Sequence, residues 1–283
     1  MAVYAYACAV TTAPRTLPRR AAAELVGSAA LTVVVVGSGI AATGLTDDVG
    51  IQLLINSIAT AFGLFVLITV IAPISGAHFN PVVTIADVAF GHRRMRDALP
   101  YVAAQLVGCI VGSLIANVMF DLPPATWSAT DRITAGHLIA EVVATAGLVF
   151  AIFVLARTGR SHFAAAVVAA YIGAAYFFTS STSFANPAIT VGRMFTDTFA
   201  GIAPSSAPLF IAAQIVGAAV GYGAVRSLVP VRADSGIAHA SPLQASMPSR
   251  MANPAMTSAA TESAQAQPST AFSSSPTSRA AER

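Results

Sequence analysis

Two Asn-Pro pairs are the residues in this chain whose types and spacing first indicate chemistry. Asn80-Pro81 lies within residues 75–84, and Asn186-Pro187 lies within residues 183–190. An Asn side chain caps free backbone N–H groups at a helix start, and Pro suits the first turn because it has no N–H to leave unpaired. One such pair in a soluble chain is typical of a surface turn. Two pairs, each set between long apolar runs, predict two half-helices that begin inside a membrane.

The composition places the chain among membrane proteins. Hydrophobic residues make up 55% of the 283 residues and charged residues 10%, whereas soluble domains carry about 25% charged residues. The mean hydropathy is +0.72. The net charge of +3 comes from scattered arginines, since the sequence has no Lys, and it is too small to indicate nucleic-acid binding.

Several kinds of site are not expected. Cys8 lies in a terminal segment and Cys109 in an apolar run, so we predict neither a disulfide nor a metal site. The sequence also lacks a Gly-rich phosphate loop, a nucleophile elbow and a cluster of metal ligands. We therefore expect no cofactor, and we do not expect an enzyme.

Six apolar runs are long enough to cross a bilayer, which takes about 20 residues each. They cover residues 21–44, 51–72, 98–119, 134–156, 162–180 and 207–229. Two shorter segments, 80–90 and 186–196, begin at the Asn-Pro pairs and are too short to cross. The predicted fold class is an all-α membrane protein with six transmembrane helices and two re-entrant half-helices.

The chain also repeats itself. AELV at residues 23–26 recurs as AEVV at 140–143, and AAQLVG at 103–108 recurs as AAQIVG at 212–217. The repeats cover about residues 21–120 and 134–229, with three spans each. Because three is odd, the second half enters from the opposite side, which predicts an inverted repeat with a pseudo-two-fold axis in the membrane plane.

The arginines predict the orientation through the positive-inside rule. They precede the first span, lie between spans two and three and between spans four and five, and follow the last span; these are Arg15, Arg19, Arg20, Arg93, Arg94, Arg96, Arg157, Arg160, Arg226 and Arg232. The opposite loops are acidic, with Arg132 as the basic exception. We expect a multi-pass protein of the inner (plasma) membrane with both termini cytoplasmic. A cleavable signal peptide at the start is an alternative, but no clear cleavage site ends the first run.

Three regions follow from this reading: a cytoplasmic N-terminal segment at residues 1–20, a channel domain at 21–232 and a tail at 233–283. The tail is rich in Ser, Ala, Pro and Thr and has no apolar period. Such a segment cannot bury enough surface to offset its ordering entropy, so we predict disorder. A docking or regulatory segment is the alternative.

The inverted repeat would bring the half-helix N-termini, at Asn80 and Asn186, together near the membrane midplane. Irregular backbone at that depth must be buried or line water. Residues 74–79 and 179–185 would then present carbonyl acceptors to a pore. The two helix N-termini carry partial positive charge that repels cations, and the Asn amides can donate hydrogen bonds to a neutral solute. The arrangement predicts a channel for small uncharged hydroxylated molecules.

At these residues the chain resembles the aquaporin or major intrinsic protein family. The resemblance rests on Gly76-Ala77-His78-Phe79-Asn80-Pro81 and on the second motif, Asn186-Pro187-Ala188, and it covers about residues 21–229. It implies six spans, two half-helices, one pore per subunit and a homotetramer in the lipid bilayer, with small neutral solutes as partners. Val82 stands where the family usually has Ala; because it is expected to pack behind the motif, little effect on conduction follows.

The resemblance also implies a filter of four positions, which in this chain are Thr60, Ala174, Ser183 and Ile189. The family usually has Arg where this chain has Ile189. Arg193 lies one helical turn, about 6 Å, further out; we assign it to the outer vestibule or to the role of the missing Arg. The implied ring has no aromatic or charged member, so it predicts a pore wider and less polar than a strict water filter.

Residues 178–190 and 195–202 are similar to a bacterial subgroup linked to arsenic resistance. The favoured function is therefore a passive channel for glycerol, urea, metalloid hydroxides such as arsenous acid and methylated arsenicals, and water. A water-selective aquaporin, a proton-coupled transporter and a non-conducting scaffold that uses the tail are the alternatives.

Three further polar residues lie within the apolar segments. Glu24 and Glu141 occupy equivalent positions of the two repeats, which favours buried braces for the loops over proton carriers. His78 could be a pH gate or a metal ligand. Because no second His or Cys stands at ligand spacing, a structural hydrogen bond is favoured.

Overall fold

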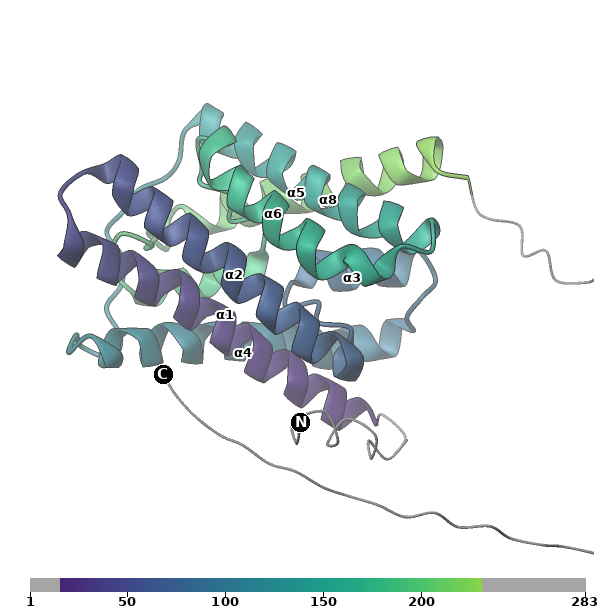
Figure 1. Cartoon of the computed structure of the whole chain (residues 1–283), viewed down its shortest axis with the longest axis horizontal. Coiled ribbons are helices and arrows are strands. Elements are labelled where there is room, and N and C mark those ends of the chain that lie inside the picture. Colours follow the sequence, from purple (N-terminus) through teal and green to yellow (C-terminus); the bar gives the residue numbers. More distant parts are fainter. Residues whose placement is uncertain (1–15, 231–283) are drawn as a thin grey trace, which may run out of the picture. The chain divides into compact units, whose positions relative to one another are not determined.

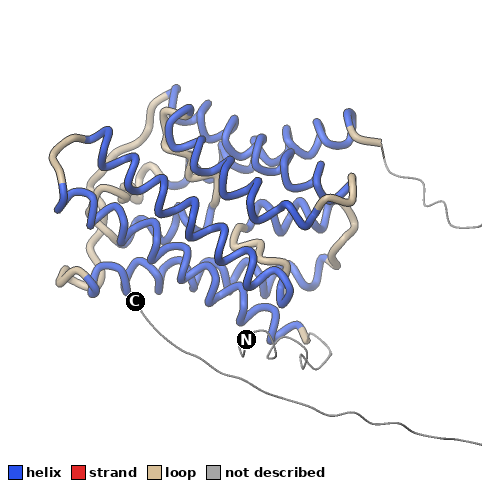
Figure 2. The backbone as a smooth tube through the Cα atoms, viewed as in Figure 1, coloured by secondary structure: helices blue, strands red, loops and turns tan. Residues whose placement is uncertain are grey.

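The computed structural model describes residues 16–230, which fold into helices and connecting loops, with no strand in that range (Figures 1 and 2). The long helices are α1 (Leu17–Leu45), α2 (Val49–Ser75), α4 (Met95–Met119), α5 (Ala135–Arg157), α6 (Ala164–Phe178) and α8 (Ala207–Leu228). The short ones are α3 (Pro81–Ala89) and α7 (Pro187–Gly192), with single 3-10 turns η2 (Ser161–Phe163) and η3 (Arg193–Phe195).

Among residues 16–230, six helices are long and apolar enough to cross a membrane, if η2 is counted with α6. They match the six apolar runs, and α3 and α7 begin directly after Asn80 and Asn186. The predicted fold class is therefore confirmed. The helices α1 and α2 extend several residues past the apolar runs at one or both ends. Arg232 and the predicted tail at 233–283 lie outside the described residues, as do Cys8 and Arg15.

The packing follows the repeat. Helix α1 packs along α4, and its counterpart α5 packs along α8. Glycines allow the close approach: Gly108 lies against the Leu25 carbonyl in the first pair, and Gly217 lies against the Val142 carbonyl in the second. A Cβ at Gly217 would lie 2.5 Å from that carbonyl oxygen. Small residues at such crossings let two backbones pack directly on each other.

The loops that precede the half-helices turn into the bundle instead of running around it (Figure 2). Helix α3 contacts α4 and α8, and α7 contacts α4 and α8 as well, so each half-helix packs on elements of both repeats. The two half-helices also contact each other. This arrangement brings their N-termini together inside the protein.

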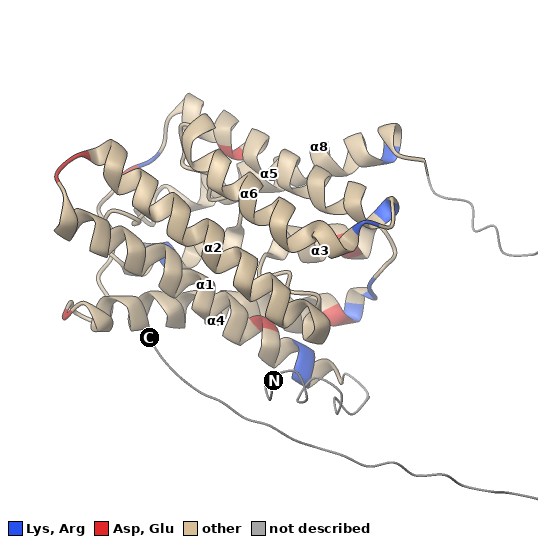
Figure 3. Cartoon of the chain, in the orientation of Figure 1, with Lys and Arg blue, Asp and Glu red and all other residues tan. Residues whose placement is uncertain are grey.

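Charge is distributed unevenly along the bundle. Figure 3 shows most of the described Arg residues at the end where α8 finishes, while the opposite loops carry several acidic residues. The basic end is the one where α1 begins and where α2 and α5 end. The arginines between residues 16 and 230 that the sequence assigns to one side therefore share one end of the described part of the chain.

Candidate functional site

A cavity of about 230 Å³ lies inside the bundle and is lined by residues of both repeats. At the basic end its wall includes His92, which follows α3, and at the other end it includes Arg193 of η3. Between these ends lie Asn80 and Asn186. The cavity therefore passes the place where the two half-helices meet.

Asn80 and Asn186 cap the half-helices and also bind across to each other's loop. Oδ1 of Asn80 accepts from the Val82 N–H at 3.1 Å, and Oδ1 of Asn186 accepts from the Ala188 N–H at 2.9 Å. Nδ2 of Asn80 donates to the Ala185 carbonyl at 2.8 Å, and Nδ2 of Asn186 donates to the Phe79 carbonyl at 2.7 Å. Each amide thus has one N–H fixed, and its second N–H remains for a molecule in the cavity.

The loops before the half-helices adopt the same unusual backbone. Ala77 and Phe79 have φ of 50°, and their counterparts Ser183 and Ala185 have φ of 50° and 47°. These left-handed conformations cost roughly 1–2 kcal/mol each for a residue with a Cβ. All four residues are buried and line the cavity. Strain of this kind persists only where surrounding contacts hold it in place.

Two buried carboxylates provide those contacts. Glu24 accepts from Ser75 Oγ at 2.6 Å, from the backbone N–H groups of His78 and Phe79 at 3.0 and 2.7 Å, and from Gln105 Nε2 at 2.8 Å. Each carboxylate oxygen therefore has two donors. Buried charge of this kind is stable when hydrogen bonds satisfy its lone pairs.

Glu141 repeats the arrangement in the second half. It accepts from Ser181 Oγ at 2.6 Å, from the N–H groups of Phe184 and Ala185 at 2.9 and 2.8 Å, and from Gln214 Nε2 at 2.7 Å. Both glutamates are fully buried, and neither is among the residues that line the cavity. The geometry favours the brace over the proton carrier.

The cavity wall beyond α7 holds a different set of groups. Thr60 Oγ1 and Tyr176 OH are hydrogen-bonded at 3.0 Å, which joins α2 of one repeat to α6 of the other. The Arg193 guanidinium lies over the Phe184 ring, 3.4 Å from its centroid, and its Nε donates to the Ala200 carbonyl. Thr60, Tyr176 and Arg193 are each less than 5% exposed and all line the cavity.

Two polar groups in this region have no partner among residues 16–230. The Arg193 Nη groups have no acceptor there, since only Nε is bound. The Ser183 hydroxyl is buried and likewise lacks a partner in the described part of the chain. Because Arg193 lines the cavity, its free Nη groups are available to a small polar molecule inside it, whereas the Ser183 hydroxyl is enclosed by the protein.

Comparison with known proteins agrees with this geometry. The family model described as "Major intrinsic protein" matches residues 12–184. The aquaglyceroporin AqpS of Rhizobium meliloti (strain 1021) is 44% identical over 213 residues, which cover 75% of this chain and 91% of the relative. This chain belongs to the major intrinsic protein family. The family prediction is therefore confirmed.

More distant relatives agree with the membership. Aquaporin TIP1-1 of Arabidopsis thaliana is 30% identical over 185 residues, covering 62% of this chain and 74% of the relative. The X-ray structure of the aquaglyceroporin from Plasmodium falciparum matches with a TM-score of 0.61 and 22% identity, over 76% of this chain and 97% of that one. At that identity the likeness shows the shared fold alone.

The structure corrects the filter ring that the family resemblance implies. Thr60, Ser183 and Ile189 line the cavity, but Ala174 is exposed on α6 and lies outside the cavity lining. Tyr176, two positions further along α6, lines it instead. Two residues turn a helix by about 200°, so the position that the resemblance implies lies on the opposite face of α6.

Tyr176 brings an aromatic ring to this part of the wall, whereas the ring implied by the resemblance has no aromatic member. Arg193 lines the same wall, and the sequence leaves its role open between the outer vestibule and the missing Arg. The spacing of Ile172 and Tyr176, four apart on one helix face, is the signal that could have identified the tyrosine. Ile189 is 5% exposed and does face the cavity, as predicted. Val82 is buried and absent from the lining, which agrees with packing behind the motif.

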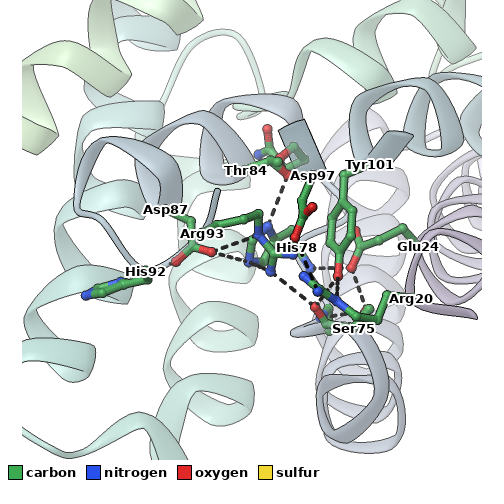
Figure 4. Close-up of polar contacts among 12 residues, drawn as sticks. Arg20, Glu24, Ser75, His78, Thr84, Asp87, His92, Arg93, Asp97 and Tyr101 are labelled. Carbon is green, nitrogen blue, oxygen red and sulfur yellow. Dashed lines mark hydrogen bonds and ion pairs between the residues drawn. The ribbon is translucent and has the colours of Figure 1, made fainter. Parts of the chain in front are cut away.

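The basic end of the cavity carries a polar network (Figure 4). Asp87 joins its members: Oδ2 accepts from Arg93 Nε at 3.0 Å, and Oδ1 lies 3.3 Å from Nδ1 of His92. His78 lies beside this pair, with Nε2 3.5 Å from Asp87 Oδ2 and Nδ1 3.1 Å from Thr84 Oγ1. The Arg93 guanidinium covers the Tyr101 ring at 4.1 Å.

These contacts make His78 part of a hydrogen-bonded network that includes Arg93 and, through Tyr101, Arg20. Within residues 16–230, no group of three His, Cys, Asp or Glu side chains could hold a metal ion. The geometry favours the structural role for His78. The sequence did not identify Asp87 or His92. Asp87 lies near the end of α3, and His92 lies on the loop after it; both become site residues only because that helix end and loop border the cavity.

Proposed function

We propose that this protein is a passive channel of the aquaglyceroporin type, which equilibrates small neutral solutes across a membrane. One observation carries the proposal: Asn80 and Asn186, at the N-termini of two half-helices from opposite repeats, line the same cavity. The positive ends of both helices repel cations at that point. The name of the bacterial relative, aquaglyceroporin AqpS, supports the same class of solute.

The wall of the cavity supports solutes that have one polar and one apolar side. Asn80, Asn186 and Arg193 provide N–H donors, and Thr60 and Tyr176 provide hydroxyls. Aliphatic side chains, such as Leu64 and Leu148, make up much of the rest of the lining. Glycerol, urea, arsenous acid and methylated arsenicals all combine hydroxyl or amino groups with less polar surface. Water fits as well, because every donor on this wall can bind it.

The proposed filter is formed by Thr60, Tyr176 and Arg193, with the Ser183 hydroxyl beside them. Arg193 supplies the guanidinium that the family usually has at the position of Ile189. The free Nη groups of Arg193 would bind a solute hydroxyl, and the Thr60–Tyr176 pair would limit its size. This replaces the wider ring without aromatic or charged members that the family resemblance implies.

A water-selective aquaporin is the second candidate. The same Tyr176 and Arg193 favour it, because they narrow the cavity and make its wall more polar.

The proposal further includes a homotetramer in the inner membrane with both termini cytoplasmic. The concentration of arginines at one end supports that orientation. Tags placed at the N-terminus and after Arg232 should both be protected in intact cells.

The deciding experiment measures uptake of water, glycerol and arsenous acid by proteoliposomes in parallel, using stopped-flow light scattering. A channel should conduct glycerol and arsenous acid as well as water, and an imposed pH gradient should not concentrate any of them. Accumulation driven by the pH gradient would establish a coupled transporter instead. Water flux without glycerol or arsenous acid flux would establish the water-selective candidate.

A further inference from the structure

Arg132 is the one described arginine on the loop between α4 and α5, and it lies near Arg193, away from the basic end of the molecule. Its guanidinium points inward: Nε donates to the Gly201 carbonyl at 2.7 Å, and Nη2 donates to the Phe199 carbonyl at 3.1 Å. Its Cζ lies 5.3 Å from the centroid of the Phe184 ring. Burial lowers the pKa of Arg132, and the nearby Glu141 and Tyr176 oppose that shift.

The carbonyl between those two belongs to Ala200, and it accepts from Nε of Arg193. Three consecutive carbonyls, at residues 199, 200 and 201, therefore bind Arg132, Arg193 and Arg132 in turn. Both guanidiniums also lie against the same Phe184 ring. Ala200 is 1% exposed, so its carbonyl is fixed within a packed segment.

The backbone around Arg132 is held by contacts that do not use its guanidinium. Its own N–H donates to Ser206 Oγ at 3.0 Å, and that hydroxyl donates to Asp131 Oδ1 at 2.7 Å. The Ala203 N–H donates to the Thr130 carbonyl at 2.7 Å. Shortening the Arg132 side chain should therefore leave the loop attached.

We propose that Arg132 is a positioning residue for the filter: it clamps residues 199–201 so that the Ala200 carbonyl fixes Nε of Arg193 and leaves the Nη groups to face the solute. An arginine has five N–H donors in a rigid fork. With Nε anchored to the Ala200 carbonyl and the guanidinium lying over the Phe184 ring, the plane of the fork is set. The inference rests on the proposed function, because it assigns a role to the filter arginine.

The contact of Arg132 with residues 199–201 explains how Arg193 can act in the filter, although it lies one helical turn beyond Ile189, where the family usually has Arg. At Arg193 the helix α7 has already ended and the chain has entered η3, so local helix geometry does not fix the side chain. The fixed acceptor at Ala200 does so instead. Without Arg132, residues 199–201 lose two side-chain donors on either side of that acceptor.

The test is a double-mutant cycle in proteoliposomes, with the ratio of glycerol to water permeability as the readout. This ratio does not depend on how many channels fold or insert, so a merely structural loss would not move it. The variants are Arg132→Ala, Arg193→Ala and the double variant. Arg160→Ala serves as a control, because it removes the same charge from an exposed position at the basic end.

Arg132→Ala should shift the ratio in the same direction as Arg193→Ala, by about threefold or more, and the double variant should match Arg193→Ala alone, since coupled residues are not additive. Arg132→Lys should shift it too, because an ammonium lacks the fork that binds two carbonyls. The ratio in Arg160→Ala should equal that of the wild type. If Arg132→Ala does not fold, Arg132→Gln replaces it in the cycle.

Two failures can be told apart. If Arg193→Ala leaves the ratio unchanged, the proposed filter itself is wrong and the inference falls with it. If Arg193→Ala shifts the ratio but Arg132→Ala and Arg132→Gln do not, only the positioning role is overturned. Additive shifts in the double variant would likewise overturn it, because they would show that Arg132 acts independently of Arg193.

Discussion

Asn80 and Asn186 lie 106 residues apart in the sequence, yet each donates its amide N–H to the loop that carries the other. The acceptors are the carbonyls of Ala185 and Phe79, the residues that directly precede the two asparagines. The two half-helices are thus held together by a reciprocal pair of hydrogen bonds. A substitution at either asparagine should therefore alter the hydrogen bonding of both loops.

Asn80→Asp and Asn186→Asp test this relationship. Each replaces an amide donor by a carboxylate oxygen that faces a carbonyl, and each places negative charge between two positive helix ends. Neutral-solute flux should fall and proton or potassium leak should rise in both variants. Asn80→Ser is the control, because Ser can cap the helix without adding charge; it should reduce flux without a leak. Folded protein with normal flux and no leak in both Asp variants would argue against the pore.

Glu24→Gln and Glu141→Gln test the braces. Each change turns one acceptor oxygen into an amide donor that faces other donors. Losing charge-assisted hydrogen bonds and leaving buried donors unpaired should cost about 3 kcal/mol. Thermal unfolding in detergent should show similar losses for both variants, because the two sites have matching partners. Asp47→Asn, at an exposed position, should leave the transition unchanged.

If Glu24 or Glu141 carried protons, the Gln variants would behave differently. They would keep their stability and lose a dependence of flux on the pH gradient. A stable Gln variant with altered pH dependence would therefore overturn the brace assignment.

Gly192→Ala tests how the end of α7 positions Arg193. A Cβ at Gly192 would lie 2.6 Å from the Cys109 carbonyl oxygen, which is backbone and cannot turn aside. The Gly192 carbonyl is also held by Ser113 Oγ at 2.7 Å. The substitution should lower the melting temperature and shift the glycerol-to-water ratio, because η3 must move. Gly223→Ala, where a Cβ meets open space, should be neutral; an equal effect there would show that the loss is generic.

The sequence predicted the features that the repeat displays twice. Each half has one of these Asn-Pro pairs, one buried glutamate and three apolar runs, so each copy supports the interpretation of the other. The structure adds their partners: Gln105 and Gln214, from the repeated AAQ segments, complete the bonding of Glu24 and Glu141.

The cavity wall beyond α7 was less predictable from the sequence, because the residues that form it do not recur in the two halves. Whether Ala174 or Tyr176 faces the cavity depends on where α6 ends and on the left-handed turn that follows, and counting residues does not provide that information. Arg132 was seen only as an exception to the charge pattern. Its inward position depends on carbonyls almost 70 residues away, which only the folded chain brings near.

The position of the filter arginine gives the sharpest prediction. Ile189 and Arg193 both line the cavity, one helical turn apart. In our proposal, Arg193 supplies the guanidinium that binds the solute in the filter. Arg193→Ala should therefore raise the permeability to glycerol and arsenous acid relative to water, by about tenfold if one interaction of roughly 1.4 kcal/mol is lost. Ile189→Arg alone should reduce the flux of all solutes, because it adds bulk and a second charge near the first.

Combining the two changes moves the guanidinium by one turn to the position that the family usually uses. The double variant Ile189→Arg with Arg193→Ala should regain much of the selectivity that Arg193→Ala loses, because a fork of donors again faces the cavity. Stopped-flow permeabilities of water, glycerol and arsenous acid for the four proteins provide the measurement. If Arg193→Ala leaves the solute preference unchanged while Ile189→Arg narrows it, the native filter has no arginine, and the wide ring implied by the sequence is correct after all.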